Sequence, residues 1–249
     1  MAGLKRYAKK MKIGLWNIDH PETASGSTRK QQRFEDIADY LAHANCDAYI
    51  ITEANAAMNL YDYSCALSAE SPFKSSRRFY GSPNIYHQVA IHSKVPIARS
   101  EVVEQINGLR VTVGNNEDCL VLYGNVVTIK DQWSKTSDLT YTDRLNQQIE
   151  AIRNLPRQRT IVAGDFNLRL GWPQKLSAHR AVKAELGGDG WSWPTEERDD
   201  TVQHVLHTRD LIVDLSFDFS VKYDEDRSSG LSDHPFVEIS ASFLNKTNA

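Results

Sequence analysis

The sequence predicts an α/β fold in which much of the strand pairing is antiparallel, and three observations support this. Short runs rich in Val, Ile and aromatic residues recur along the chain, mostly separated by polar residues or by Gly and Pro. Three other stretches repeat apolar residues at helical spacing. Many neighbouring runs lack the helical crossover that parallel neighbours need, so we expect them to pair antiparallel.

Three helices are expected. The first covers residues 33–44, where apolar residues at i, i+3, i+4 and i+7 form one stripe. The second covers residues 142–156 with the same pattern, and Thr140 and Asp143 at its start have the spacing of a capping box. The third covers residues 177–188 and ends on a pair of glycines.

The expected strands cover residues 12–18, 47–53, 87–93, 110–114, 119–129, 159–166, 201–207, 212–221 and 235–243. A chain of 249 residues with 41% hydrophobic residues can bury one large core, and no repeat or linker divides it. We therefore expect a single domain over residues 1–249. Its basic N-terminal segment, residues 1–10, is expected to be loosely ordered.

Charge and cysteine content limit the classes of partner. The formal net charge of -3 provides no global basic field, so a polyanion has to be met by a local patch. Three widely spaced cysteines without a CxxC pair fit reduced thiols in a cytoplasmic protein. No apolar run is long enough to cross a bilayer, so membrane insertion is not expected.

Acid, amide and imidazole side chains stand at the ends of four expected strands: Asn17, Asp19, Glu53, Asp165, Asn167, Asp233 and His234. If the last strand runs antiparallel to the others, these groups meet at one edge of the sheet. Carboxylates crowded together raise one another's pKa unless a cation lies among them. Oxygen ligands with few imidazoles suit Mg²⁺ or Mn²⁺ better than Zn²⁺. Taken singly, each of these residues is more often a turn former, and only their joint pattern favours a metal site.

Five segments together resemble a known family in their order along the chain: LWNID at 15–19, IITEA at 50–54, QVAIHSKVPI at 88–97, VAGDFN at 162–167 and LSDHPFV at 231–237. They are similar to the endonuclease/exonuclease/phosphatase superfamily, which includes deoxyribonuclease and abasic-site endonuclease relatives, sphingomyelinases and inositol polyphosphate phosphatases. The resemblance implies a four-layer α/β sandwich, with two mixed β-sheets face to face, helices outside and the active site at one end.

The resemblance also implies roles for the residues at the strand ends. Glu53 is expected to be the principal ligand of Mg²⁺ or Mn²⁺, and three further residues complete the shell directly or through water: Asn17, Asp19 and Asp233. Asp165 is expected to deprotonate the attacking water, and Asn167 to hold the water or a phosphate oxygen. His234 is expected to stabilise the charge that builds on the phosphoryl oxygen.

Two departures from the family pattern lie in these regions. Gln203 stands where many relatives have an aspartate that bonds the catalytic histidine, although Asp199 or Asp200 offers an alternative partner. In the run LVLYGNVV, Tyr123 retains a phenol seen in some relatives, whereas Asn125 replaces a histidine. Either the enzyme is tuned differently or its activity is reduced.

The sequence thus predicts a Mg²⁺- or Mn²⁺-dependent phosphoesterase that hydrolyses phosphodiester bonds in DNA or RNA. Lys74, Arg77 and Arg78 form a local basic cluster that can contact a phosphate backbone, although a solvated turn is the commoner outcome. The alternative is a phosphatase or phosphodiesterase of small or lipid-linked phosphates. A second alternative, suggested by Gln203 and Asn125, is a phosphate-binding or nucleic-acid-binding protein of the same fold that lacks turnover.

Overall fold

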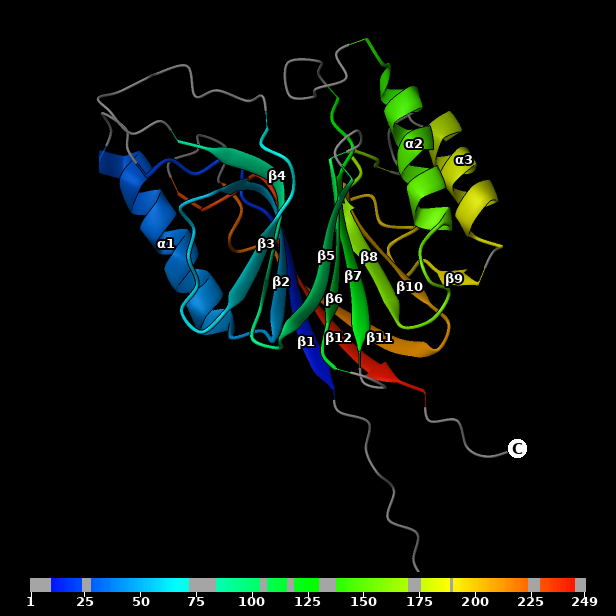
Figure 1. Ribbon diagram of the computed structural model, residues 1–249. Helices are drawn as coiled ribbons and strands as arrows, with labels where there is room; N and C mark the ends of the chain where they lie inside the picture. Colours follow the sequence, from blue (N-terminus) through cyan, green and yellow to red (C-terminus); the bar gives the residue numbers. More distant parts are fainter. Residues whose placement is uncertain are drawn as a thin grey trace, which may run out of the picture.

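Two mixed β-sheets pack face to face, and helices cover their outer faces (Figure 1). This arrangement was obtained from a computed structural model, which describes residues 10–23, 28–71, 84–103, 107–115, 119–129, 138–169, 176–188, 190–223 and 229–244. The predicted four-layer α/β sandwich is confirmed. Of the expected loosely ordered segment 1–10, only Lys10 lies within the described residues.

The first sheet has the strand order β11-β12-β1-β2-β4-β3. In that order its strands span Leu211–Asp218, Phe236–Phe243, Met11–Asn17, Ala48–Asn55, Tyr86–Ser93 and Ser64–Leu67. Helix α1, Thr28–Ala44, lies on the outer face and connects β1 to its parallel neighbour β2. Strand β12 runs antiparallel to β1, as the sequence predicts.

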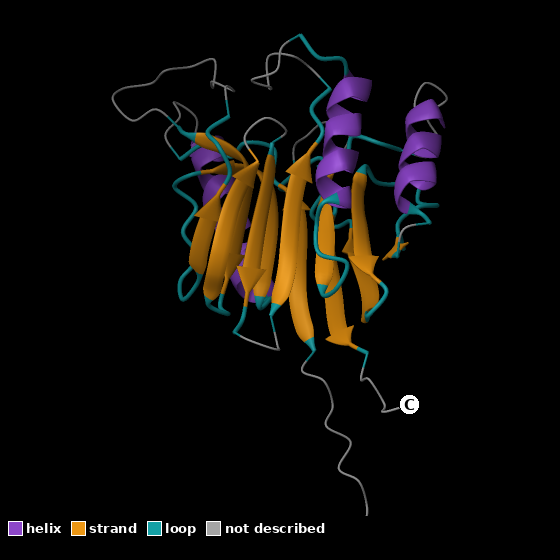
Figure 2. Ribbon diagram, turned by 45° about the vertical axis from the view of Figure 1, so that its right-hand side comes forward, coloured by secondary structure: helices purple, strands orange, loops and turns teal. Residues whose placement is uncertain are grey.

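The second sheet has the strand order β5-β6-β7-β8-β10-β9. In that order its strands span Ile97–Val103, Gly108–Val113, Leu120–Val126, Thr160–Asp165, Gln203–Thr208 and Trp191–Ser192. Helix α2, Tyr141–Arg153, is the crossover between the parallel strands β7 and β8. Helix α3, Leu176–Leu186, lies on the same outer face as α2 (Figures 1 and 2).

The predicted capping box of α2 is present. The Thr140 side chain accepts a hydrogen bond from the Asp143 backbone amide, and the Asp143 carboxylate accepts one from the Thr140 backbone amide. Two of the amides left unpaired at a helix start are satisfied in this way.

The main core fills the space between the two sheets. Its fully buried members include Leu15 and Ile50 from the first sheet and Leu122 and Ile161 from the second. Burial of each such side chain contributes about 1.5–3 kcal/mol to stability. Two further apolar clusters pack α1 against the first sheet and α2 and α3 against the second. The strands that carry the polar end groups are therefore fixed on both faces.

Three strands were not predicted from the sequence: β3, β5 and β9. Most of β5 is exposed at the edge of its sheet, so its sequence IARSEVV carries no alternation of apolar and polar residues. Helix α1 begins at Thr28, earlier than predicted. The first turn is polar and exposed, so it carries no apolar stripe from which its start could be predicted. Within the residues described, no helix combines the length and apolarity needed to cross a membrane.

Candidate active site

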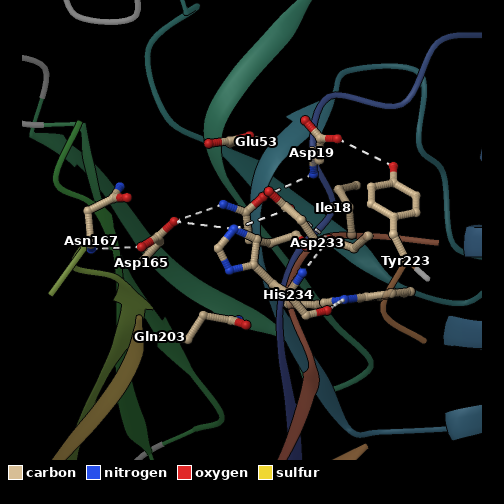
Figure 3. Close-up of polar contacts among 12 residues, drawn as sticks. Ile18, Asp19, Glu53, Asp165, Asn167, Gln203, Tyr223, Asp233 and His234 are labelled. Carbon is tan, nitrogen blue, oxygen red and sulfur yellow. Dashed lines mark hydrogen bonds and ion pairs between the residues drawn. The ribbon is translucent and has the colours of Figure 1, made fainter. Parts of the chain in front are cut away.

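The polar strand ends meet at one end of the sandwich, and they come from both sheets. The ends of β1 and β2 and the segment before β12 belong to the first sheet, whereas β8 belongs to the second. The expectation that all of them share one sheet edge is therefore wrong. Asn17 and Asp165 join the two sheets, because Asn17 Nδ2 donates to Asp165 Oδ2 at 2.9 Å (Figure 3).

Asp165 is the buried acid at the centre of this site and is only 1% exposed. Its Oδ1 accepts the backbone amide of Asn167 at 2.8 Å. Burial raises the pKa of Asp165 to about 6, and the charge of Glu53 adds to the increase, while His234, Asn167 and Asn17 oppose it. A carboxylate with a pKa near neutrality and two fixed hydrogen bonds is suited to act as a general base.

Gly164 and Asn167 shape the chain on either side of Asp165. A Cβ at Gly164 would meet the Asn125 carbonyl oxygen at 2.1 Å, so only glycine fits between β7 and β8 at this point. Asn167 has a φ of 47°, a left-handed conformation that asparagine adopts more readily than most residues. Its Nδ2 donates to the Val127 carbonyl at 3.0 Å, which fixes the side-chain amide.

His234 lies between two carboxylates. Its Nε2 is 3.2 Å from Asp233 Oδ1 and 3.9 Å from Asp165 Oδ2 (Figure 3). The backbone of His234 is held from both sides, because its amide donates to Ser232 Oγ at 3.1 Å and its carbonyl accepts from Trp16 Nε1 at 3.1 Å. The imidazole is therefore positioned by the first sheet and faces the acid of the second.

Glu53, Asp19 and His20 form the group that best fits a metal ion. One ligand atom from each lies within 4.8 Å of the others. Burial raises the pKa of Asp19, and the charges of Asp233 and Glu53 raise it further, although Arg33 and His20 oppose them. Burial would also raise the pKa of Glu53, but His20, His234 and Asn17 outweigh it and lower the pKa. Crowded acids of this kind are stabilised by a divalent cation, so the donor set fits one.

The other two expected metal ligands have different contacts. Asn17 is buried, and its Oδ1 accepts the backbone amide of Asp19 at 3.0 Å. The Asp233 side chain is half-exposed and lies against His234. The Asp19 carboxylate also accepts a hydrogen bond from the Tyr223 hydroxyl at 3.3 Å. Neither His20 nor Tyr223 stands out in the sequence, because His20 resembles a turn residue before proline and Tyr223 is far from the other site residues along the chain.

Gln203 is buried on β10 directly opposite Asp165. When the Gln203 amide is oriented to satisfy both ends, its nitrogen donates to the Pro235 carbonyl at 2.8 Å and its oxygen accepts the Asn17 backbone amide at 3.3 Å. Gln203 thus bonds the backbone next to His234, and none of the contacts found among the described residues joins it to the imidazole. Asp200 pairs with Arg198 at 2.5 Å, and among the described residues the His234 imidazole pairs with Asp233 and Asp165 instead.

Tyr123 and Asn125 lie outside the site, contrary to expectation. Tyr123 belongs to the cluster under α2, where its hydroxyl donates to Gln148 Oε1 at 2.8 Å. Asn125 is two residues after Tyr123, so it faces the same side of β7. Its side chain lies against Gly164. Asp165 points to the opposite face, between the sheets. The proposed substrate-binding residues Lys74, Arg77 and Arg78 lie outside the described residues.

The fold and the site define a four-layer α/β protein with an acid and imidazole centre between its two sheets. Residues 14–234 match the Endonuclease/Exonuclease/phosphatase family, and the chain belongs to this family. The resemblance noted in the sequence is thus confirmed. No curated protein sequence matches the chain significantly.

Solved structures share the fold at low sequence identity. The structure of D. rerio TDP2 complexed with single strand DNA product is 18% identical with a TM-score of 0.62, and the match covers 94% of this chain and 99% of that chain. The endonuclease domain of TRAS1, a telomere-specific non-LTR retrotransposon, is 15% identical with a TM-score of 0.62, covering 94% and 99%. Sphingomyelinase C from Streptomyces griseocarneus is 16% identical with a TM-score of 0.63, covering 93% and 99%.

Proposed function

We propose that the protein is a divalent-metal-dependent phosphoesterase that hydrolyses phosphodiester bonds in DNA or RNA. The observation that carries the proposal is the placement of Asp165, a buried acid with a pKa of about 6, at 3.9 Å from His234 and close to the Asp19 and Glu53 group. Membership of the Endonuclease/Exonuclease/phosphatase family supports a hydrolytic phosphoesterase.

The residues divide the chemistry between them. Asp165 accepts the proton of the attacking water, and its hydrogen bonds from Asn17 and Asn167 keep its carboxylate in one orientation. His234 donates a hydrogen bond to a non-bridging phosphoryl oxygen, where negative charge builds in the transition state. The asparagine amide of Asn167 lies beside Asp165 and contacts the water or the phosphate.

Glu53 and Asp19 hold the cation in this proposal, and Asn17 and Asp233 contribute directly or through water. When bound there, a cation would supply positive charge to the phosphoryl oxygens and to the leaving group. Mg²⁺ and Mn²⁺ both suit the carboxylate-rich donor set. Three cysteines without disulfide partners, Cys46, Cys65 and Cys119, are compatible with a cytoplasmic location.

A nucleic acid is the proposed substrate because two of the similar structures are a TDP2 bound to a DNA product and an endonuclease domain. The similarity to sphingomyelinase C favours the alternative, a small or lipid-linked phosphodiester. The binding-protein alternative is weakened because Asn125, one of its two motivations, lies away from the site.

Turnover of bis(p-nitrophenyl) phosphate with Mg²⁺, with Mn²⁺ and with EDTA tests the proposal. We expect activity that requires the metal and that falls at least tenfold in Glu53→Gln, while exposed Glu35→Gln on α1 remains unchanged. Full activity in EDTA would refute metal dependence, and no turnover with either metal would favour the binding protein. A panel of single-stranded DNA, double-stranded DNA, RNA and phosphoinositides then separates the substrate classes.

A further inference from the structure

The His20 imidazole is a buried nitrogen donor that the proposed mechanism does not use. Its side chain is 6% exposed, and its Nδ1 lies 2.9 Å from Glu53 Oε2. The ring packs edge-on against Tyr86, with 5.1 Å between the ring centroids. The Nδ1 of His20 therefore faces the carboxylate of the proposed principal metal ligand, Glu53.

The backbone brings His20 to this position. The His20 amide donates to the Glu53 carbonyl at 3.1 Å, just as the Ile18 amide donates to the Thr52 carbonyl at 3.1 Å. In an extended chain, consecutive side chains point to opposite sides. Asp19 and His20 both have a φ of 47°, and this left-handed turn brings both side chains within 4.8 Å of Glu53.

The spacing of the two donor atoms matches a shared metal ion. Adjacent ligands at about 2.1 Å from an octahedral ion lie about 3.0 Å apart. His20 Nδ1 and Glu53 Oε2 are 2.9 Å apart and form an ion pair or hydrogen bond, and a cation bound by both atoms would replace the proton between them at nearly the same spacing. The Asp19 carboxylate is the third member of the group.

A nitrogen ligand changes which metal the site prefers. Mg²⁺ is a hard cation that favours oxygen ligands and retains water, whereas later divalent metals bind imidazole more strongly. An acid pair alone provides little discrimination between Mg²⁺ and Mn²⁺. The addition of one imidazole shifts the balance toward Mn²⁺.

We propose that His20 is a nitrogen ligand of the divalent cation, beside Glu53 and Asp19, and that it makes the site prefer Mn²⁺ to Mg²⁺. This inference rests on the proposed metal dependence. It concerns a residue outside the set that the sequence resemblance assigns to the metal.

Electron paramagnetic resonance of the metal-free protein titrated with Mn²⁺ tests the inference without measuring activity. The free Mn²⁺ signal gives the dissociation constant, and competition gives that of Mg²⁺. Electron spin echo modulation of bound Mn²⁺ detects a directly coordinated imidazole nitrogen. We expect this nitrogen signal in the wild type and its loss in His20→Asn.

We expect His20→Asn to weaken Mn²⁺ binding on the order of tenfold or more and Mg²⁺ binding by less than about threefold. The matched control His43→Asn removes an exposed imidazole at the end of α1 and leaves both constants unchanged. Thermal unfolding of both variants checks the fold. The wild-type nitrogen signal decides the question even if His20→Asn is poorly folded.

The outcomes separate this inference from the proposed function. Mn²⁺ binding that is lost in Glu53→Gln but shows no nitrogen coupling in the wild type overturns the role of His20 and leaves metal dependence intact. A nitrogen signal that persists in folded His20→Asn assigns the ligand to another imidazole, such as that of His234, and also overturns it. Absence of any site-specific Mn²⁺ binding refutes the metal site itself.

Discussion

Four residues of the site have left-handed backbone conformations without being glycine: Asp19, His20, Glu53 and Asn167, with φ between 47° and 54°. Such conformations cost on the order of 1 kcal/mol or more for most side chains, and they tend to persist where function requires them. Asp19 and His20 follow β1, Asn167 follows β8, and Glu53 lies within β2 near its end. For Asp19, His20 and Glu53, the ligand atoms lie within 4.8 Å of one another.

The pH dependence of activity follows from Asp165. Because the pKa of Asp165 is about 6, its carboxyl is protonated in acid and cannot accept a proton. A bound cation favours the carboxylate, so we expect activity to fall on acidification with a midpoint at or below about pH 6. Asp165→Asn should lower kcat at pH 7.5 by about 10²–10⁴-fold. The exposed Asp214→Asn on β11 serves as the control.

The same pKa affects stability in the metal-free protein. The folded pKa is above the unfolded value near 3.9, so the folded state binds more protons between about pH 4 and 6. The contribution of Asp165 to the free energy of unfolding is therefore full below pH 4 and is lost as the pH rises through about 6. Urea unfolding at several pH values compares wild type with Asp165→Asn. An identical pH dependence in the two proteins would contradict the assignment.

Gln203 provides a second test at the scale of single residues. Gln203→Glu removes the amide hydrogens that bond the Pro235 carbonyl and places a second acid opposite Asp165. We expect a loss of about 1–3 kcal/mol in the free energy of unfolding at pH 7.5, without extension of activity to higher pH. The control is the exposed Gln147→Glu on α2. Increased activity at high pH would instead place Gln203 against the His234 imidazole.

Sequence patterns predicted which residues belong to the site more successfully than they predicted which residues contact one another. Asp165 and His234 end or precede apolar runs and match specific motifs, so they were found directly. His20 was overlooked because a lone histidine before proline is usually a turn residue, and only the left-handed backbone shows that it faces Glu53. The prediction that Tyr123 belongs to the site was wrong. It was based on the phenol group, whereas the alternation of side chains along β7 directs Tyr123 toward α2.

At the scale of elements, β7 and α2 explain what Tyr123 does. The Tyr123 hydroxyl donates to Gln148 Oε1 in the buried layer between these elements. We expect Tyr123→Phe to lower the free energy of unfolding by about 0.5–1.5 kcal/mol, because one buried hydrogen bond is lost. Activity per folded molecule should stay within about twofold of wild type. Urea unfolding and kcat are the measurements.

The conservative variant Tyr141→Phe is the comparison for Tyr123→Phe. The Tyr141 hydroxyl donates to the Phe166 carbonyl at 2.9 Å, between Asp165 and Asn167, so its loss affects the site as well as stability. A large decrease in kcat for Tyr123→Phe, with stability unchanged, would restore the catalytic role that the sequence suggested.

Elements with strong periodicity or capping signals were predicted well. Helix α2 has an apolar stripe and a capping box, and both are present. The edge strand β5 was missed because exposure on both faces leaves no apolar pattern. The start of α1 was placed too late because a solvent-facing first turn lacks apolar residues.

At the scale of the whole molecule, the site depends on the packing of two sheets. Asp233 and His234 precede β12, whereas the other polar groups lie at the C-terminal ends of their strands. This difference predicted that β12 runs antiparallel to β1, and the prediction is confirmed. Sheet membership could not be derived from strand patterns alone, because β1, β2 and β8 are all buried apolar runs. Only the packing of the two sheets brings Asn17 into contact with Asp165 and so forms the candidate active site.

The overall charge of the molecule leads to the last prediction, which concerns the substrate. A chain with a net charge of -3 has no global attraction to a polyanion, so a nucleic acid must be held by a few side chains. Lys74, Arg77 and Arg78, outside the described residues, are the proposed contacts. Replacing all three by Gln should weaken oligonucleotide binding and make its salt dependence shallower, because fewer counterions are released.

The measurement is the dependence of the oligonucleotide binding constant on salt concentration, the salt slope, in the wild type and in the triple variant. The charge-matched control replaces three exposed basic residues by Gln: Arg29, Lys30 and Arg153. The control removes the same charge from helices α1 and α2, so a shallower slope in the first variant alone assigns the contacts to the segment around residue 77. Sequence preference should remain the same, since phosphate contacts position a strand without reading its bases. Equal slopes in all three proteins, together with unchanged turnover of bis(p-nitrophenyl) phosphate, would favour a small phosphodiester as the substrate.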